Sequence, residues 1–311
     1  MVGAGTIGLS WAALFSAHGV RVHLTDPRDD LEPTLHEQLP MLAASLWTSS
    51  DDLLQRIEIT GDLREAVRDA DVVQENGPEQ LAFKRELFAD IAENAPESAV
   101  LASSSSGIVA SEIARTLPDA VAGRLLVAHP FNPPQVVPLV EIVPGERTAE
   151  QAVRCAHEFY SGLGKTPVRI RKEVSGFVAN RLQSALLQEA IHLVLNGVVD
   201  ASELDTVMRS SLGGRWATVG PFESFHLGGG PGGIRHMMQH LGSGMAERWK
   251  DLGHPALTPD NAEELIDQIE TAYGADAQTY RERARLRDRK QIALNRAVRD
   301  ATGEDDGQQG V

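Results

Sequence analysis

The chain has 311 residues, of which 42% are hydrophobic and 5% aromatic, and its formal net charge is −15. This length and composition fit a globular protein of two domains, at roughly 150 residues per domain. The acidic balance provides no basic face for the phosphates of nucleic acids or anionic membranes, so we expect neither as a partner. Cys155 is the single cysteine, which excludes an intrachain disulfide and is typical of the reducing cytoplasm.

The first half of the chain alternates short apolar runs with helical patterns. Strands are predicted at 21–26, 71–76, 99–104, 125–130, near 140–145 and at 166–172, and helices at 62–70 and 81–95. This alternation predicts a mainly parallel sheet that helices cover on both faces. The pattern favours an α/β fold of the doubly wound, Rossmann type over residues 1–172.

The second half changes to helical periodicity. Apolar residues of 174–198 recur at helical spacing, which predicts a long amphipathic helix that stops at Gly197. Further helices are predicted at about 262–272 and 277–299. The sequence therefore indicates an all-α C-terminal domain over residues 173–300, followed by a disordered tail at 301–311.

A glycine motif opens the chain. Gly3, Gly5 and Gly8 have G-x-G-x-x-G spacing, with Thr6 and Ile7 between the last two. In a dinucleotide-binding fold the first glycine permits a tight turn and the second lets the backbone approach the pyrophosphate. The third lets helix and strand pack closely, and the helix N-terminus faces the anion. A helical pattern and then a strand follow the motif here, as that function requires.

An acidic residue ends the strand after this motif. Asp26 can accept hydrogen bonds from the adenosine ribose, and its charge repels a 2′-phosphate, so NAD is the expected cofactor. Arg28 is the nearby residue that would favour NADP. Only Met1 and Val2 precede the motif, so the first strand of the sheet is expected to be truncated.

A histidine and a glutamate flank a proline-rich loop. His129 follows the apolar run 125–128 and so lies at the carboxyl end of a predicted strand, where open parallel sheets bind ligands. Removing hydride from a secondary alcohol requires a base for the hydroxyl proton, which suits histidine. Glu141 is the candidate carboxylate to fix the imidazole tautomer. The residues alone equally allow a structural core histidine and a surface acid.

Five segments add a resemblance to a known family. They are "SSSSGI", "AHPFNPP", "LVEIVPG", "GKTPV" and "GFVANRL", in this order. With the glycine motif they resemble the L-3-hydroxyacyl-CoA dehydrogenase family from Gly3 to about residue 240. The resemblance implies a Rossmann domain, a helical C-terminal domain and a homodimer through the C-terminal helices. It also implies that His129 is the general base and Glu141 its partner.

The resemblance implies roles for four further residues. Ser106 and Asn180 match polar contacts to the reacting oxygen and its surroundings, and Glu79 and Lys84 match positions that contact the nicotinamide nucleotide. The alternatives are a turn residue for Ser106, a helix cap for Asn180 and a solvated ion pair for Glu79 and Lys84.

Two features bear on the substrate. The segment 26–56 is short, acidic and free of lysine, so it is a poor dock for an anionic CoA tail. The pattern "GxRWA…GPFE" around Arg215 resembles the branch that holds L-gulonate 3-dehydrogenase (lambda-crystallin) and L-carnitine dehydrogenase. An arginine can bind a small carboxylate bidentately, so Arg215 is predicted to bind substrate; the alternative is a surface charge or an ion pair. Trp216 faces either the substrate or the core.

The predicted function is NAD-dependent oxidation of the 3-hydroxyl group of a small polar L-3-hydroxy acid to the 3-keto acid. The alternatives are a 3-hydroxybutyryl-CoA dehydrogenase and a non-catalytic dinucleotide-binding structural protein. A 6-phosphogluconate-type dehydrogenase relies on a lysine base, so the pair of His129 and Glu141 argues against it. No metal site is predicted, because His236 and His240 fit an exposed helix face and lack a third ligand at suitable spacing.

Overall fold

The computed structural model describes residues 1–302, which divide into two compact units, Met1–Arg181 and a second unit from Leu182 onward. Of the predicted disordered tail, residues 303–311 lie outside the described part, and residues 301–302 end the last helix. Within residues 1–302, no helix is both long and apolar enough to cross a membrane.

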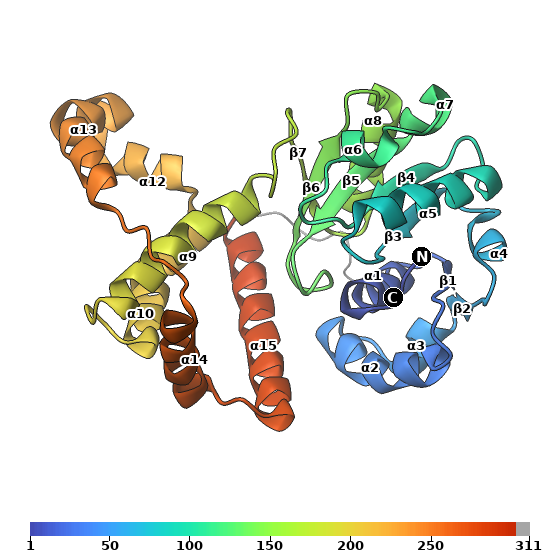
Figure 1. Ribbon diagram of the computed structural model, residues 1–311, viewed down its shortest axis with the longest axis horizontal. Coiled ribbons are helices and arrows are strands. Elements are labelled where there is room, and N and C mark those ends of the chain that lie inside the picture. The colour runs from blue at the N-terminus through green and yellow to red at the C-terminus, as the bar shows by residue number, and fades with distance from the viewer. Residues whose placement is uncertain (303–311) are drawn as a thin grey trace. The chain divides into compact units, whose positions relative to one another are not determined.

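The first unit is built on a mainly parallel sheet, as predicted (Figure 1). Its strands, in spatial order, are β3 (Val72–Glu75), β4 (Val100–Ser103), β5 (Leu125–Pro130), β6 (Leu139–Pro144) and β7 (Thr166–Arg169). β6 runs antiparallel to β5, and the other neighbours are parallel. The reversal at β6 is what brings residues on either side of the proline-rich loop face to face.

A second, two-stranded ladder pairs β1 (Val22–Leu24) with β2 (Ile57–Ile59), and β2 was not predicted. Val2 forms a bridge to Thr25 on one side and to Glu75 on the other. This single residue therefore connects the two ladders at the position of the first strand. It also places the glycine motif, which begins at Gly3, at the carboxyl end of the sheet.

Helices cover both faces of the sheet. The buried side chains of one core cluster come from α1 (Thr6–Ala17), α2 (Leu31–Ser45), α3 (Ser50–Leu54) and α8 (Glu150–Gly162). Those of the other come from α4 (Leu63–Val67), α5 (Leu81–Asn94), α6 (Ala110–Ala114) and α7 (Asp119–Ala122). β5 sends Leu126 and Ala128 into the first cluster and Leu125 and Val127 into the second, as strand geometry requires. The arrangement confirms the doubly wound α/β fold.

The second unit is helical. Its elements are most of α9 (Ala179–Leu195), then α10 (Ala201–Met208), a π-helical turn (Arg209–Gly213), α11 (Gly214–Thr218), α12 (Pro221–Gly228), a 3₁₀ turn (Gly230–Gly232), α13 (Gly233–Asp251), α14 (Pro259–Tyr273) and α15 (Ala277–Thr302). The left-handed conformation of Gly197, at φ +66°, follows α9, where the predicted stop lies. Few apolar side chains are buried in this unit, whereas many large ones are exposed.

Candidate active site

His129 and Glu141 are direct cross-strand partners in the antiparallel pairing of β5 with β6. Opposite residues of such a pair have Cβ atoms about 5 Å apart, so their side chains meet. The Nδ1 atom of His129 lies 2.9 Å from Oε2 of Glu141, and both residues are buried. Strand register, rather than the stiffness of the intervening loop, therefore brings the imidazole and the carboxylate together.

The ionisation of Glu141 fixes the tautomer of His129. Burial raises the pKa of Glu141, but the His129 hydrogen bond and the N–H groups of Ala179 and Val178 outweigh burial and hold the pKa below its usual value. An ionised carboxylate can only accept hydrogen bonds, so Nδ1 of His129 carries the ring proton. The Nε2 atom of a neutral imidazole then has the free lone pair, which is what a general base requires.

A strained turn supplies the other ligands of Glu141. Gly176 and Phe177 both have positive φ, +72° and +50°. They direct the N–H groups of Val178 and Ala179 onto Oε1 of Glu141 at 2.9 and 3.1 Å. A bulky residue in this conformation costs about 1–3 kcal/mol and persists where its surroundings enforce it. Phe177 is fully buried, with its ring centroid 5.3 Å from that of His129.

This turn corrects the prediction of one helix from residue 174. α9 begins at Ala179 because the two left-handed residues interrupt the helical backbone. Sequence reasoning did not assign Phe177 to the site. Gly176, just before it, was the available signal for a non-helical turn. The helical spacing of Phe177 with the apolar residues that follow it concealed that signal.

The proline-rich loop, residues 131–138, is fastened by a lysine that was also missed. Lys165 is buried, and its ammonium donates to the carbonyl oxygens of Pro134 and Val137. Its Nζ lies 5.3 Å from the ring centroid of Trp11 in α1. Burial lowers the pKa of Lys165 from 10.5 to about 7. The same loop places the ring of Phe131 5.1 Å from that of His129.

Ser106 and Asn180 are brought together. The side-chain amide of Asn180 donates to the carbonyl oxygen of Ser106 at 3.3 Å, and Ser106 is exposed. Asn180 follows Ala179, whose N–H binds Glu141. The two polar residues and the imidazole pair therefore belong to one connected set of contacts within the first unit.

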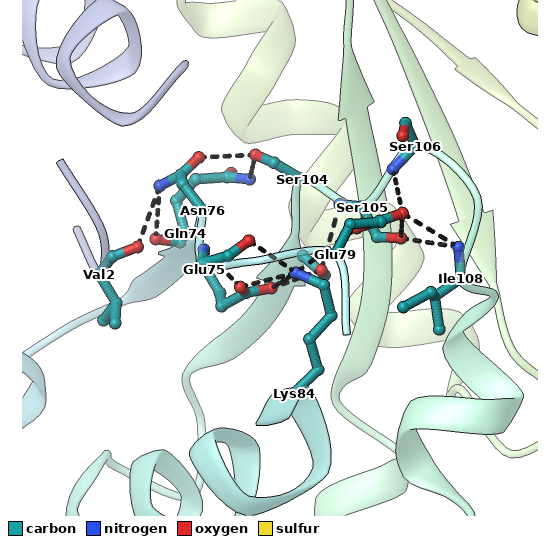
Figure 2. A network of polar contacts seen from close by, with 12 residues as sticks. Val2, Gln74, Glu75, Asn76, Glu79, Lys84, Ser104, Ser105, Ser106 and Ile108 are labelled. Carbon is teal, nitrogen blue, oxygen red and sulfur yellow. Dashed lines mark hydrogen bonds and ion pairs between the residues drawn. The ribbon is translucent and has the colours of Figure 1, made fainter. Parts of the chain in front are cut away.

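Glu79 and Lys84 lie in a polar network beside Ser106 (Figure 2). Lys84 is buried and donates to both oxygens of Glu75, at 2.8 and 2.9 Å, and to the carbonyl oxygen of Gly77 at 3.3 Å. Each of the three protons of the Lys84 ammonium thus has an acceptor. A direct hydrogen bond from Lys84 to a nucleotide therefore requires one of these three hydrogen bonds to break. Its role in cofactor binding stays a prediction. Glu75, fully buried at the end of β3, was not singled out from the sequence.

A second part of the network connects the glycine motif to the serine-rich segment. Ser104 donates to Oδ1 of Asn76 at 2.7 Å and accepts from Nε2 of Gln74 at 2.8 Å. Asn76 in turn donates to the carbonyl oxygen of Val2 at 3.2 Å. As Figure 2 shows, Val2, Asn76 and Ser104 form a continuous chain of contacts.

The glycine motif fits a dinucleotide. Gly3 has φ +89°, and a Cβ atom there would lie 2.9 Å from the backbone of Asn76. A Cβ atom on Gly8 would lie 1.9 Å from the carbonyl oxygen of Gly3, whereas one on Gly5 would meet no atom within 4 Å. The N-terminus of α1 has no side-chain cap and no acidic residue in its first turn, which includes Thr6 and Ile7. Tight packing on one side and open space on the other are what a pyrophosphate site at a helix N-terminus requires.

Asp26 is attached to this motif. Its Oδ2 atom accepts the N–H of Ala4 at 2.7 Å, and its Oδ1 atom accepts from Nε of Arg28 at 3.1 Å. Burial raises the pKa of Asp26, but the N–H groups of Ala4 and Arg28 and the guanidinium of Arg28 together lower it. Arg28 is therefore paired with the acid that would exclude a 2′-phosphate.

The remaining predicted residues lie in the second unit. Arg215 lies on α11 and is exposed, and Trp216 beside it is 39% exposed rather than in the core. Their contribution to a substrate site stays a prediction. His236 and His240 have ring centroids 4.2 Å apart on α13. Among the described residues, no group of three or more metal-ligating side chains gathers.

Comparison with known proteins agrees with this site. Residues 1–174 match the family model "3-hydroxyacyl-CoA dehydrogenase, NAD binding domain", and residues 176–254 match that family's C-terminal domain. The chain is 40% identical over 307 residues to an L-carnitine dehydrogenase of Nocardiopsis dassonvillei, covering 96% of this chain and 90% of the relative. It is 41% identical over 256 residues to a 3-hydroxyacyl-CoA dehydrogenase of Gibberella moniliformis, covering 81% and 79% of the two chains.

Among solved structures, the 5-formyl-3-hydroxy-2-methylpyridine 4-carboxylic acid 5-dehydrogenase, an NAD-dependent dismutase, has a TM-score of 0.80 at 25% identity, over 96% of each chain. The matched models span both units, and the glycine motif, Asp26 and the imidazole–carboxylate pair all lie within the NAD-binding match. The chain belongs to the 3-hydroxyacyl-CoA dehydrogenase family and is an NAD-dependent dehydrogenase.

Proposed function

We propose that the protein oxidises the 3-hydroxyl group of a small polar L-3-hydroxy acid to the 3-keto acid. The observation that carries the proposal is the buried pair of His129 and Glu141, in which the carboxylate leaves Nε2 of the imidazole as the base. NAD, which the glycine motif and Asp26 would hold, would supply the hydride acceptor for the alcohol carbon. The chain's own task is to take the hydroxyl proton and to hold the substrate.

The proton leaves the substrate hydroxyl for Nε2 of His129. The ring then becomes an imidazolium, and the charge of Glu141 stabilises it through the hydrogen bond at Nδ1. The phenyl rings of Phe131 and Phe177 hold the imidazole plane. Ser106 and Asn180, which are joined to each other, provide polar groups for the reacting oxygen.

The composition of segment 26–56 favours a free acid over a CoA thioester. Asp29, Asp30, Glu32 and Glu37 are exposed around the start of α2, and like charges disfavour the phosphates of CoA. Several relatives near 40% identity are named L-carnitine dehydrogenase. L-Carnitine is a 3-hydroxy acid with a quaternary ammonium group, so it is the first compound to test.

We assign Arg215 to the substrate carboxylate. A guanidinium provides two parallel donors to a carboxylate, and this residue is exposed on α11. Arg215→Ala should raise KM for free acids about tenfold to a hundredfold while changing kcat less, because a bidentate ionic contact is lost from ground and transition states alike. An unchanged KM would refute this assignment.

A substrate panel tests the proposed reaction. It contains L-carnitine, L-gulonate, 3-hydroxybutyrate and 3-hydroxybutyryl-CoA, with NADH absorbance as the readout. We expect turnover on a free acid and little on the thioester, and a preference for the thioester would favour the alternative acyl-CoA function. His129→Ala is the control for chemistry, because it should abolish turnover and leave NADH binding unchanged. Turnover on no compound, with tight NADH binding, would favour a structural dinucleotide-binding protein.

We propose that residues 173–300 form the substrate and dimerisation domain, with the homodimer made through its helices. A helical unit normally buries one apolar stripe of each helix, yet Leu182, Leu186 and Leu187 on α9 are 63%, 40% and 54% exposed. A second copy of the chain would cover them, as the family resemblance implies. Sedimentation velocity should give a dimer for the wild type and a monomer for Leu182→Glu/Leu186→Glu. Trp47→Glu, at an exposed residue of the first unit, is the control that should remain dimeric.

We further propose a cytoplasmic location. Cys155 is a free, partly exposed thiol, and unpaired thiols persist in a reducing compartment. Cell fractionation followed by immunoblotting would test this, and recovery in a secreted fraction would contradict it.

A further inference from the structure

One carboxylate oxygen holds the serine loop, which we define as residues 103–108. Glu79 lies between β3 and α5 and directs its Oε1 atom at this loop (Figure 2). Four donors converge on that atom: the hydroxyl of Ser105 at 2.7 Å and the N–H groups of Ser106, Gly107 and Ile108 at 3.0, 2.8 and 3.3 Å. Donors from four successive residues thus meet a single acceptor.

The buried ion pair of Lys84 with Glu75 orients the carboxylate of Glu79 from the side opposite the loop. The Nζ atom of Lys84 lies 3.8 Å from Oε2 of Glu79 while it donates to both oxygens of Glu75. Glu75 also accepts the hydroxyl of Ser103 at 2.6 Å. The chain of contacts therefore starts at one end of the serine loop, passes through Lys84 and returns to the loop at Glu79.

The charge of Glu79 strengthens this attachment. Burial raises the pKa of Glu79, but the Ser105 hydroxyl, the N–H groups of Gly107 and Ile108 and the charge of Lys84 together lower it. Hydrogen bonds to an ionised acceptor are shorter and stronger than those to a neutral one. The loop's N–H groups are therefore bound to an anion that is part of the chain.

We propose that Glu79 is a positioning residue that holds the serine loop in the conformation that presents Ser106 to the substrate, with Lys84 orienting it. The inference rests on the proposed function in one respect, namely that Ser106 contacts the substrate. Glu79 acts on Ser106 through the loop, and this role is additional to the contact with the nicotinamide nucleotide that the family resemblance implies.

A double-mutant cycle separates the two roles. Because Glu79 acts through Ser106, its removal should cost nothing further once the Ser106 hydroxyl is gone. We expect Glu79→Ala and Ser106→Ala each to lower kcat/KM about 10-fold to 100-fold, and the double variant to match Ser106→Ala within about threefold. These rates are measured at saturating NAD, so that cofactor affinity does not enter kcat/KM for the substrate. Losses that multiply in the double variant would overturn the proposal.

Amide hydrogen exchange tests the loop without any turnover. Removing Glu79 frees the N–H groups of Ser106 and Gly107, so their exchange in Glu79→Ala should accelerate about tenfold or more. Glu93→Ala, at an exposed position of α5, the helix that follows Glu79, should leave their exchange unchanged. Unchanged exchange in Glu79→Ala would overturn the proposal. Faster exchange in a protein that oxidises no compound of the substrate panel would refute the proposed function alone and leave the loop assignment standing.

Discussion

Replacing Glu141 with glutamine should invert the tautomer of the base. In the wild type, Oε1 of Glu141 accepts the N–H groups of Val178 and Ala179, and Oε2 accepts Nδ1–H of His129. The glutamine oxygen must stay with the two backbone donors, because the reversed amide would face them with its own N–H groups. The amide nitrogen therefore faces Nδ1, which becomes an acceptor, and the ring proton moves to Nε2. The atom that should receive the substrate proton is then already protonated.

The size of the effect follows from these contacts. The substitution removes a charge-assisted hydrogen bond of about 1.5–3 kcal/mol to the imidazolium, and the reactive tautomer must be regained before each turnover. An enzyme whose orienting carboxylate is replaced by its amide loses about 10⁴-fold in kcat, which is about 5.4 kcal/mol at roughly 1.36 kcal/mol per factor of ten. Glu141 is likewise buried, so solvent cannot replace its hydrogen bond. We therefore expect kcat to fall by about 10³-fold to 10⁴-fold.

Steady-state NADH formation on the best substrate of the panel measures this loss. NADH binding and the urea unfolding midpoint should be measured alongside, to show that the site is intact. Glu146→Gln, at an exposed residue just after β6, is the matched control and should retain wild-type rates. A Glu141→Gln enzyme that kept more than about a tenth of wild-type kcat would refute the tautomer argument.

Three further predictions concern the frame around the site. Asp26→Ala removes the acceptor of the Ala4 N–H, so KM for NAD should rise about tenfold or more and the preference for NAD over NADP should fall. Initial rates with both cofactors measure this preference, and an unaltered preference would contradict the prediction. Gly8→Ala places a Cβ atom 1.9 Å from the carbonyl oxygen of Gly3 and should cost about 1–3 kcal/mol in unfolding free energy, with weaker NADH binding; wild-type urea stability would contradict it. Lys165 has a folded-state pKa of about 7 against an ordinary 10.5, so the unfolded chain binds one more proton between these values and wild-type stability should rise as pH increases through that window. The rise is of the order of 5 kcal/mol at full extent, and Lys165→Met should lack that part of the slope in urea titrations; parallel curves for the two proteins would be evidence against it.

Apolar runs in the sequence predicted the strands whose own residues are continuously buried. The apolar run before His129 predicted β5, and the run around Glu141 predicted β6, because both strands are buried and read as continuous hydrophobic stretches. β2 escaped prediction because it is three residues long and only Ile57 and Ile59 mark it. Its existence depends on pairing with β1, more than thirty positions away, and a sequence window does not contain that partner.

The same distinction applies to the site. The glycine motif and the acid at its proper distance are local patterns, so the cofactor was predictable and the family comparison confirms NAD. Lys165 and Glu75 were not found, because a buried charge is recognisable only from what surrounds it. Phe177 was placed in a helix because its spacing matched apolar residues further along α9. Its positive φ accompanies tertiary contacts of its ring with His129 and of the next two N–H groups with Glu141, which have no local counterpart.

Because the base and its acid are paired across a β-ladder, the connection between them is free to vary in length. Residues added to or removed from the tip of that hairpin would leave the two side chains opposed, whereas a slip of one residue in the ladder would place them on opposite faces of the sheet. The length of this connection can therefore diverge among related proteins while the base and its acid stay paired.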